Sequence, residues 1–133
     1  MKKSTVNKTY IMRQRLLYLV LAVFLIIIGL LSRRESAIPM EVGDALWAMM
    51  LYCLFRFLCI GRNLRSVAVT TLLTAYIVEF QQLIRWPWLV RLRSSTIGHL
   101  VLGSDFSTCD LFAYTLGVLV ICTLDCILFK DCT

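Results

Sequence analysis

Four polar side chains in the second half of this 133-residue chain have the types and spacing that a binding or acid–base site needs. Glu79 and Gln82 are three residues apart, so they share one face of a helix. His99, the only histidine, lies in the glycine-flanked segment 98–103, and Asp110 follows it. Carboxyl and imidazole groups can transfer protons, while guanidinium groups pair with phosphate through two parallel hydrogen bonds.

We expect these side chains to line a polar pocket at one end of the molecule, together with nearby acidic and basic residues. The expected members are Asp44, Glu79, Gln82, Arg91, Arg93, His99 and Asp110. Taken alone, Asp44 and Asp110 could instead cap helices, and a lone histidine could be structural. The chain has no recognisable nucleophile or metal-ligand motif, so binding is favoured over catalysis. We expect neither a metal nor a cofactor, and whether the protein is an enzyme stays open.

A second polar pair is predicted at greater depth. Arg56 follows Asp44 by 12 residues and Asp125 follows Asp110 by 15, which places them roughly 18 and 22 Å below the same surface at about 1.5 Å per residue. Opposite charges at similar depth on different helices can neutralise one another as a buried ion pair. Alternatively, the Arg56 side chain extends to the headgroups on the far side. The sequence leaves both interpretations open.

Four long apolar segments must position these residues, and they cover most of the chain: 16–31, 45–60, 66–84 and 111–129. A hydrocarbon core about 30 Å thick needs roughly 17–25 apolar residues per helix. Hydrophobic residues make up 59% of the chain, above the share of about 45–50% in globular domains. The sequence predicts an all-α polytopic membrane protein. Its single domain, 1–133, would be a compact bundle of four transmembrane helices, with a short re-entrant or interfacial segment between the third and fourth.

The fourth segment carries one coherent inward stripe. Asp110, Tyr114, Gly117, Ile121 and Asp125 recur at spacings of four, three, four and four residues, so they share a helix face. A glycine on such a face would let a neighbouring helix approach closely.

Basic residues predict the orientation and the cellular location. The tail through Arg15 contains five Lys/Arg and no acid, and the +6 net charge is concentrated in tails and loops beside apolar segments. Such residues stay in the cytoplasm and meet anionic lipid headgroups, so we expect membrane lipids and not nucleic acid as partners. We predict a multi-pass protein of the bacterial inner membrane with both termini cytoplasmic and the polar pocket outside. An oligomer stays open.

Five short motifs, in this order, resemble a family of small bacterial inner-membrane proteins of unknown function. They are GLLSR at 29–33, GDALWA at 43–48, EFQQ at 79–82, GHLVLG at 98–103 and DLFAYTLG at 110–117. The resemblance covers nearly the whole chain and implies topology without an activity. The order of acid, glutamine, aspartate and glycine is also distantly similar to VanZ-like proteins, which are linked to glycopeptide resistance and the cell envelope. Those usually carry a Pro-x-Arg element, which only Pro87 with Arg91 or Arg93 approximates here.

Three functional hypotheses follow. In the first, the outward-facing pocket binds or processes a lipid-linked or cell-wall intermediate, and Arg85, Arg91 and Arg93 hold its phosphate. In the second, the protein is a small proton-coupled exporter with Glu79 as the carrier, although the internal repeat of many transporters is missing. In the third, it is an accessory or structural membrane protein whose polar residues only set helix packing.

Overall fold

The computed structural model describes residues 2–129, with side chains from Lys8 onward, and this range is all-helical. This confirms the predicted fold class. The helices are α1 (Lys2–Ser32), α2 (Met40–Leu58), α3 (Leu64–Gln81), α4 (Pro87–Arg93), α5 (Thr96–Leu102) and α6 (Thr108–Phe129).

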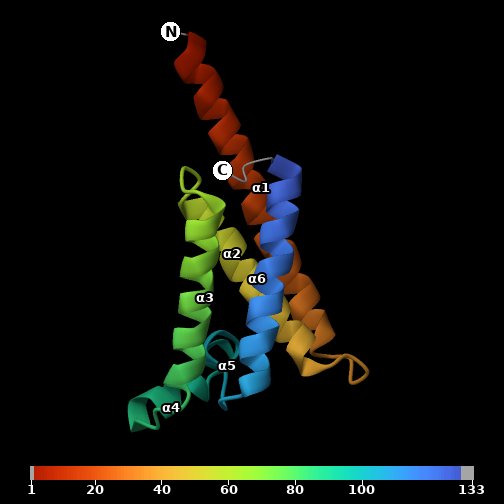
Figure 1. Cartoon of the computed structure of the whole chain (residues 1–133). Helices are drawn as coiled ribbons and strands as arrows, with labels where there is room; N and C mark the ends of the chain where they lie inside the picture. The colour runs from red at the N-terminus through yellow and green to blue at the C-terminus, as the bar shows by residue number, and fades with distance from the viewer. Residues whose placement is uncertain (1, 130–133) are drawn as a thin grey trace.

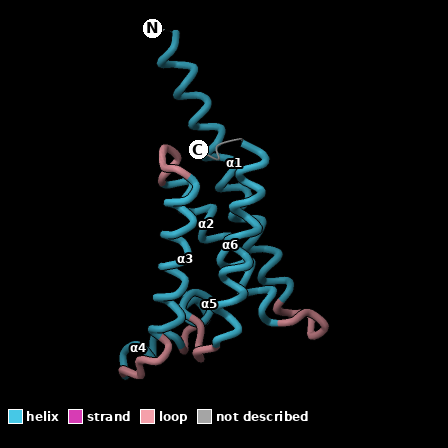
Figure 2. Tube along the Cα trace, viewed as in Figure 1, coloured by secondary structure: helices cyan, strands magenta, loops and turns pink. Residues whose placement is uncertain are grey.

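The four long helices form a bundle around α2, which contacts α1, α3 and α6 (Figure 1). The N-terminal part of α1 projects beyond the bundle. The start of α1, the α2–α3 turn and the end of α6 lie at one end of the bundle. The α1–α2 loop and the two short helices lie at the other, as the loop colouring in Figure 2 makes clear. Successive long helices therefore run in alternating directions, and α2 and α6 point the same way.

Several predicted boundaries need correction. The segment predicted at 16–31 belongs to a helix that begins at Lys2, because the basic tail continues the helix without a proline or glycine to stop it. The segment predicted at 66–84 ends at Gln81, and a turn carries the chain to Pro87. The predicted interfacial or re-entrant segment is the pair α4 and α5, and Pro87 occupies the first turn of α4, where its missing N–H costs nothing.

Two helical stretches are long and apolar enough to cross a membrane: Lys8–Ser32 within α1, and α6. The other two long helices, α2 with 19 residues and α3 with 18, fall short of that measure because each carries charged residues. Glu41, Asp44 and Arg56 lie within α2, and Arg65 and Glu79 lie within α3. Helix composition in the described chain therefore does not confirm four membrane spans.

The outer surface of the bundle is apolar, and its core contains small residues. Ile77, Phe112 and Leu116 are examples of large apolar side chains that are more than 60% exposed on α3 and α6. Contiguous exposed apolar surface of this kind suits lipid or a partner better than water. Inside, Ala22 and Ala48 are almost completely buried at the junction of α1 and α2.

A close approach between α2 and α6 occurs at Gly117 of α6. A Cβ atom there would overlap the carbonyl oxygen of Ala45 and lie 3.1 Å from its carbonyl carbon. This confirms the predicted role of Gly117 in close packing. The predicted stripe of α6 is also confirmed, because Tyr114, Ile121 and Asp125 are buried along with this glycine.

Candidate functional site

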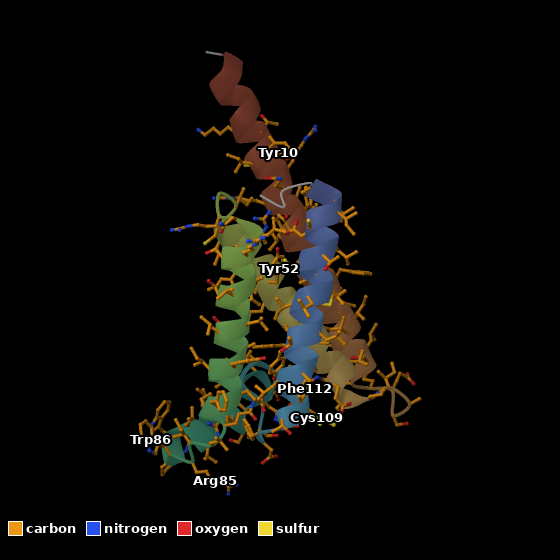
Figure 3. The ribbon with its side chains drawn as sticks, in the orientation of Figure 1. Tyr10, Tyr52, Arg85, Trp86, Cys109 and Phe112 are labelled. Atoms are coloured by element: carbon orange, nitrogen blue, oxygen red, sulfur yellow. The ribbon has the colours of Figure 1, made fainter. Side chains whose placement is uncertain are left out.

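A buried polar cluster joins α1, α2 and α6 in the half of the bundle that holds the two chain ends. Arg56 Nε lies 2.9 Å from Asp125 Oδ2. The hydroxyls of Tyr18 and Tyr52 donate to the two carboxylate oxygens of Asp125 at 2.6 and 2.7 Å. Figure 3 shows Tyr52 within this part of the bundle. All four side chains are buried, so the cluster is shielded from its surroundings.

The guanidinium of Arg56 has further partners within the protein. Its Nη2 donates to the Tyr18 hydroxyl at 3.2 Å, and its Nη1 donates to the backbone carbonyl of Arg62 at 2.9 Å. The side chain is only 3% exposed, so the structure places Arg56 in the ion pair and not at the headgroups. Since protein groups satisfy both charges, the cluster offers no open position for a ligand. Its chemistry is that of a structural link.

Glu79 occupies a second buried polar region, between α3 and α6. It is completely buried, and its carboxyl oxygens accept three hydrogen bonds. These come from the Tyr114 hydroxyl at 3.0 Å, the Gln82 amide at 3.1 Å and the Ser107 backbone N–H at 2.7 Å. Three donors on one carboxyl satisfy its charged form without solvent. Glu79 therefore ties the loop before α6 to the end of α3.

Asp44 lies near this region, just before the predicted span 45–60. Its carboxyl accepts a 3.2 Å hydrogen bond from Arg33. Burial, together with the negative charges of Asp110 and Glu79, raises the pKa of Asp44 from 3.8 to about 6, and Arg33 opposes this shift. The structure thus brings three predicted carboxyls close enough to repel one another. The alternative role of Asp44 as a helix cap is wrong, because α2 begins at Met40, one turn earlier.

Arg93 caps the end of α3. Its guanidinium donates to the backbone carbonyls of Gln81, Gln82 and Ile84 and to the Gln81 side-chain oxygen at 2.6 Å. The last carbonyls of a helix have no partners within the helix, so a buried cation is well placed to satisfy them. Most of this side chain is therefore committed to the fold, and only its Nε has no hydrogen-bond partner within the described chain.

A polar cavity of about 880 Å³ lies between the end of α3, the two short helices and the loop before α6. Its lining includes Gln82, Arg85, Arg93, His99 and Asp105. Of these, Gln82 and Arg93 are buried, at 6% and 7% exposure, and each has an unpaired polar atom, Oε1 and Nε respectively. Both atoms have almost no accessible surface, so a ligand in the cavity reaches them only when the two side chains rotate; it would then relieve the cost of leaving a buried acceptor and a buried donor unpaired.

Gly103 leaves room for the Gln82 amide. This glycine ends α5 with φ of 68°, in the left-handed region that favours glycine, and a Cβ atom on it would overlap Gln82 Nε2. In the space that this glycine leaves, the Gln82 nitrogen donates to Glu79, while the Gln82 oxygen has no partner within the described chain. The motif 98–103 predicted from sequence thus shapes the cavity through its terminal glycine as well as through His99.

The predicted pocket residues separate into two groups. Asp44 and Asp110, which are half-buried, gather near the fully buried Glu79. Gln82, Arg93 and His99 line the cavity, where His99 is exposed. Arg91 is exposed on α4 and is not among the cavity-lining residues. Within residues 2–129, no three His, Cys, Asp or Glu side chains are grouped in a way that could hold a metal ion.

Four interacting residues were missed in the analysis of the sequence as site members: Tyr18, Tyr52, Tyr114 and Arg33. Each tyrosine sits at a helical spacing within an apolar run, where its ring reads as ordinary core. For the three tyrosines, the signal that indicates such a role is the hydroxyl, because a buried tyrosine usually has a hydrogen-bond partner.

The region from residue 33 to residue 118 matches the family described as a protein of unknown function, DUF2809. The chain belongs to the DUF2809 family. The match takes in the polar cavity, the buried carboxyls and Arg56, whereas Tyr18 and Asp125 lie outside it. No solved structure matches the chain. The prediction of a family of unknown function is confirmed, and the distant similarity to VanZ-like proteins stays a prediction.

Proposed function

We propose that this DUF2809 protein is an integral membrane protein that binds the phosphate-bearing headgroup of an anionic lipid in the polar cavity. The observation that carries the proposal is the pair of unpaired polar atoms on two buried lining residues, Arg93 Nε and Gln82 Oε1. After a rotation of the two side chains toward the cavity, a phosphate oxygen would accept from Arg93, while a hydroxyl or amine of the same headgroup would donate to Gln82.

The remaining polar lining suits such a headgroup. Arg85 and His99 add donors beside Arg93, and charge-assisted hydrogen bonds to phosphate are about twice as strong as neutral ones. Asp105 adds an acceptor for a hydroxyl or amine. A ligand that carries both an anion and a neighbouring donor therefore uses the whole lining, which a free anion would not.

The surroundings of the cavity favour a lipid as the source of the phosphate. Trp86 and Trp88 flank the start of α4, are 58% and 60% exposed, and have ring centroids 6.1 Å apart. Figure 3 shows Trp86 beside Arg85 at the α4 end of the molecule. Exposed indole rings prefer the headgroup level of a bilayer. The lining also contains apolar side chains, among them Leu83 and Phe106, that can contact the start of a lipid chain.

We further propose that all four long helices cross the inner membrane of a bacterium, with both termini in the cytoplasm. The alternating helix directions support this, because they place both chain ends at the same end of the bundle. The basic tail before Leu16 would then stay inside and the cavity would open to the outer face. Two of the charges that lower the hydropathy of α2 are paired within the protein, Arg56 with Asp125 and Asp44 with Arg33.

The other two hypotheses rank lower on specific observations. A carrier carboxyl must meet solvent or substrate, but Glu79 is completely buried, has three donors and is not among the cavity-lining residues. A purely structural role would leave the two unpaired atoms of the cavity without an explanation. An envelope lipid-linked intermediate is one member of the ligand class that the cavity fits.

The test is lipid binding by the full chain in neutral detergent, followed by native mass spectrometry. The probes are a phosphatidylglycerol, whose headgroup carries a phosphate and hydroxyls, and the diacylglycerol with the same chains, which lacks the phosphate. We expect binding of the phosphatidylglycerol only. Arg85→Ala should weaken it about tenfold, because a charge-assisted hydrogen bond contributes about 1.5 kcal/mol or more and 1.4 kcal/mol corresponds to a factor of ten.

Arg91→Ala is the matched control, since Arg91 is exposed on the neighbouring helix but is not part of the lining. It should leave binding within about twofold of the parent protein. Equal losses in the two variants would indicate non-specific attraction to surface charge, and the accessory role would then be the better explanation.

A further inference from the structure

A second hollow lies against an adjacent face of α5, next to the polar cavity. It has a volume of about 230 Å³ and lies between α1, α2 and α5. We call it the apolar groove. Ile26 of α1, Met50 of α2 and Val101 of α5 are among its lining residues, and Arg33 is the only charged one. An apolar cavity of about 150 Å³ is large enough to bind a benzene molecule, so this groove can take a section of hydrocarbon chain.

The two hollows meet at one side chain. Leu100 lines both the polar cavity and the apolar groove, while its neighbour His99 lines only the cavity and Val101 only the groove. The short helix α5 therefore contributes one face to a polar hollow and the adjacent face to an apolar one, with Leu100 at their boundary. A molecule with a polar head and an apolar chain matches this division, and a water-soluble phosphate compound does not.

We infer that the apolar groove holds a hydrocarbon chain of the lipid whose headgroup occupies the polar cavity, with the chain passing beside Leu100. This inference rests on the proposed function and narrows it to a phosphate-bearing lipid with at least one long chain. The groove walls are apolar apart from Arg33, whose guanidinium is already paired with Asp44 at 3.2 Å, so no free charge opposes a chain there.

The experiment fills the groove from the wall farthest from the cavity. Ile26→Trp on α1 adds bulk to the groove, and Ile26 does not line the cavity. Ile77→Trp is the matched control, because Ile77 is an isoleucine of α3 that is 67% exposed and lines neither hollow. Purified full-length protein in phosphatidylcholine nanodiscs is titrated with two probes, a long-chain phosphatidic acid and glycerol 3-phosphate.

We expect Ile26→Trp to weaken binding of the phosphatidic acid at least fivefold while binding of glycerol 3-phosphate stays the same. Ile77→Trp should change neither. Unchanged binding of both probes to Ile26→Trp would overturn the chain site and leave the headgroup site intact. If neither probe binds the parent protein, the proposed function fails as well. A fall in binding of both probes would also overturn the inference unless Val101→Trp, which fills the same groove from α5, affects the long-chain probe alone.

Discussion

The Nε atom of Arg56 lies 2.9 Å from Oδ2 of Asp125, although the two residues are on different helices and their side chains are 3% and 2% exposed. The remaining oxygen of Asp125 accepts from Tyr18, and Tyr52 adds a second donor to the paired oxygen. An ion pair buried this deeply is stable only while both charges are present, because the removal of one leaves the other without solvent or partner.

Arg56→Leu alone should therefore destabilise the protein by roughly 3–5 kcal/mol, the usual cost of breaking a buried pair. The double change with Asp125→Leu should recover a large part of that loss, because no unpaired charge is left behind. Thermal unfolding of the purified protein in detergent measures both. Strictly additive losses would mean that the two charges do not interact in the detergent-solubilised protein.

Tyr52→Phe, which removes one neutral donor, should lower the free energy of unfolding by only about 1–3 kcal/mol.

The contact of Gly117 with Ala45 predicts the effect of a single methyl group. Gly117→Ala should destabilise the protein by about 1–3 kcal/mol, because the new Cβ would meet the backbone of α2, which cannot move aside as a side chain can. Gly29→Ala is the matched control on another helix, since its Cβ would lie 3.9 Å from Leu46 Cβ in ordinary contact. The control should be neutral or slightly stabilising. Equal melting temperatures for both variants would contradict the close approach.

The raised pKa of Asp44 predicts a dependence of stability on pH. The folded protein binds the Asp44 proton with a pKa of about 6, against 3.8 for the free side chain, so the folded state holds more protons between these values. Stability from this group is therefore fully present below about pH 3.8 and is lost as pH rises through about 6. Asp44→Asn should reduce the gain in melting temperature that the parent protein shows between pH 7.5 and pH 5. An identical gain in both proteins would assign the effect to another group.

The alternating helix directions predict the membrane topology. Reporter fusions at Arg65 and after Phe129 should both report a cytoplasmic location, and a fusion at Ser95 should report an external one. The reason is that four crossings place the α2–α3 turn with both chain ends and the short helices on the other side. An external signal after Phe129 would require either an odd number of crossings or an inverted bundle, and either result would overturn the proposed topology.

Depth and helical periodicity allowed much of this arrangement to be anticipated. The spacing of residues on 111–129 predicted the buried face of α6, and rise per residue placed Arg56 and Asp125 at similar depth. Periodicity could not predict the split of the pocket residues, because the segment between α3 and α6 contains two turns whose geometry depends on tertiary contacts. Arg93 was expected to hold a ligand, but most of its donors bind the end of α3. The spacing of residues along the chain does not show whether an arginine will bind a ligand or the backbone of a neighbouring helix.

The steric contact at Gly117 and the ion pair at Asp125 together constrain how the bundle can move. They are eight residues apart on α6, about 12 Å along its axis, and their partners Ala45 and Arg56 follow in the same order on α2. Two helices in contact at a single point can still rotate and slide relative to one another. A second contact at a different height along α2 and α6 opposes both motions. Any rearrangement of this small protein therefore keeps α2 and α6 together as one unit, and α1 moves with them because Tyr18 is hydrogen-bonded to the same ion pair.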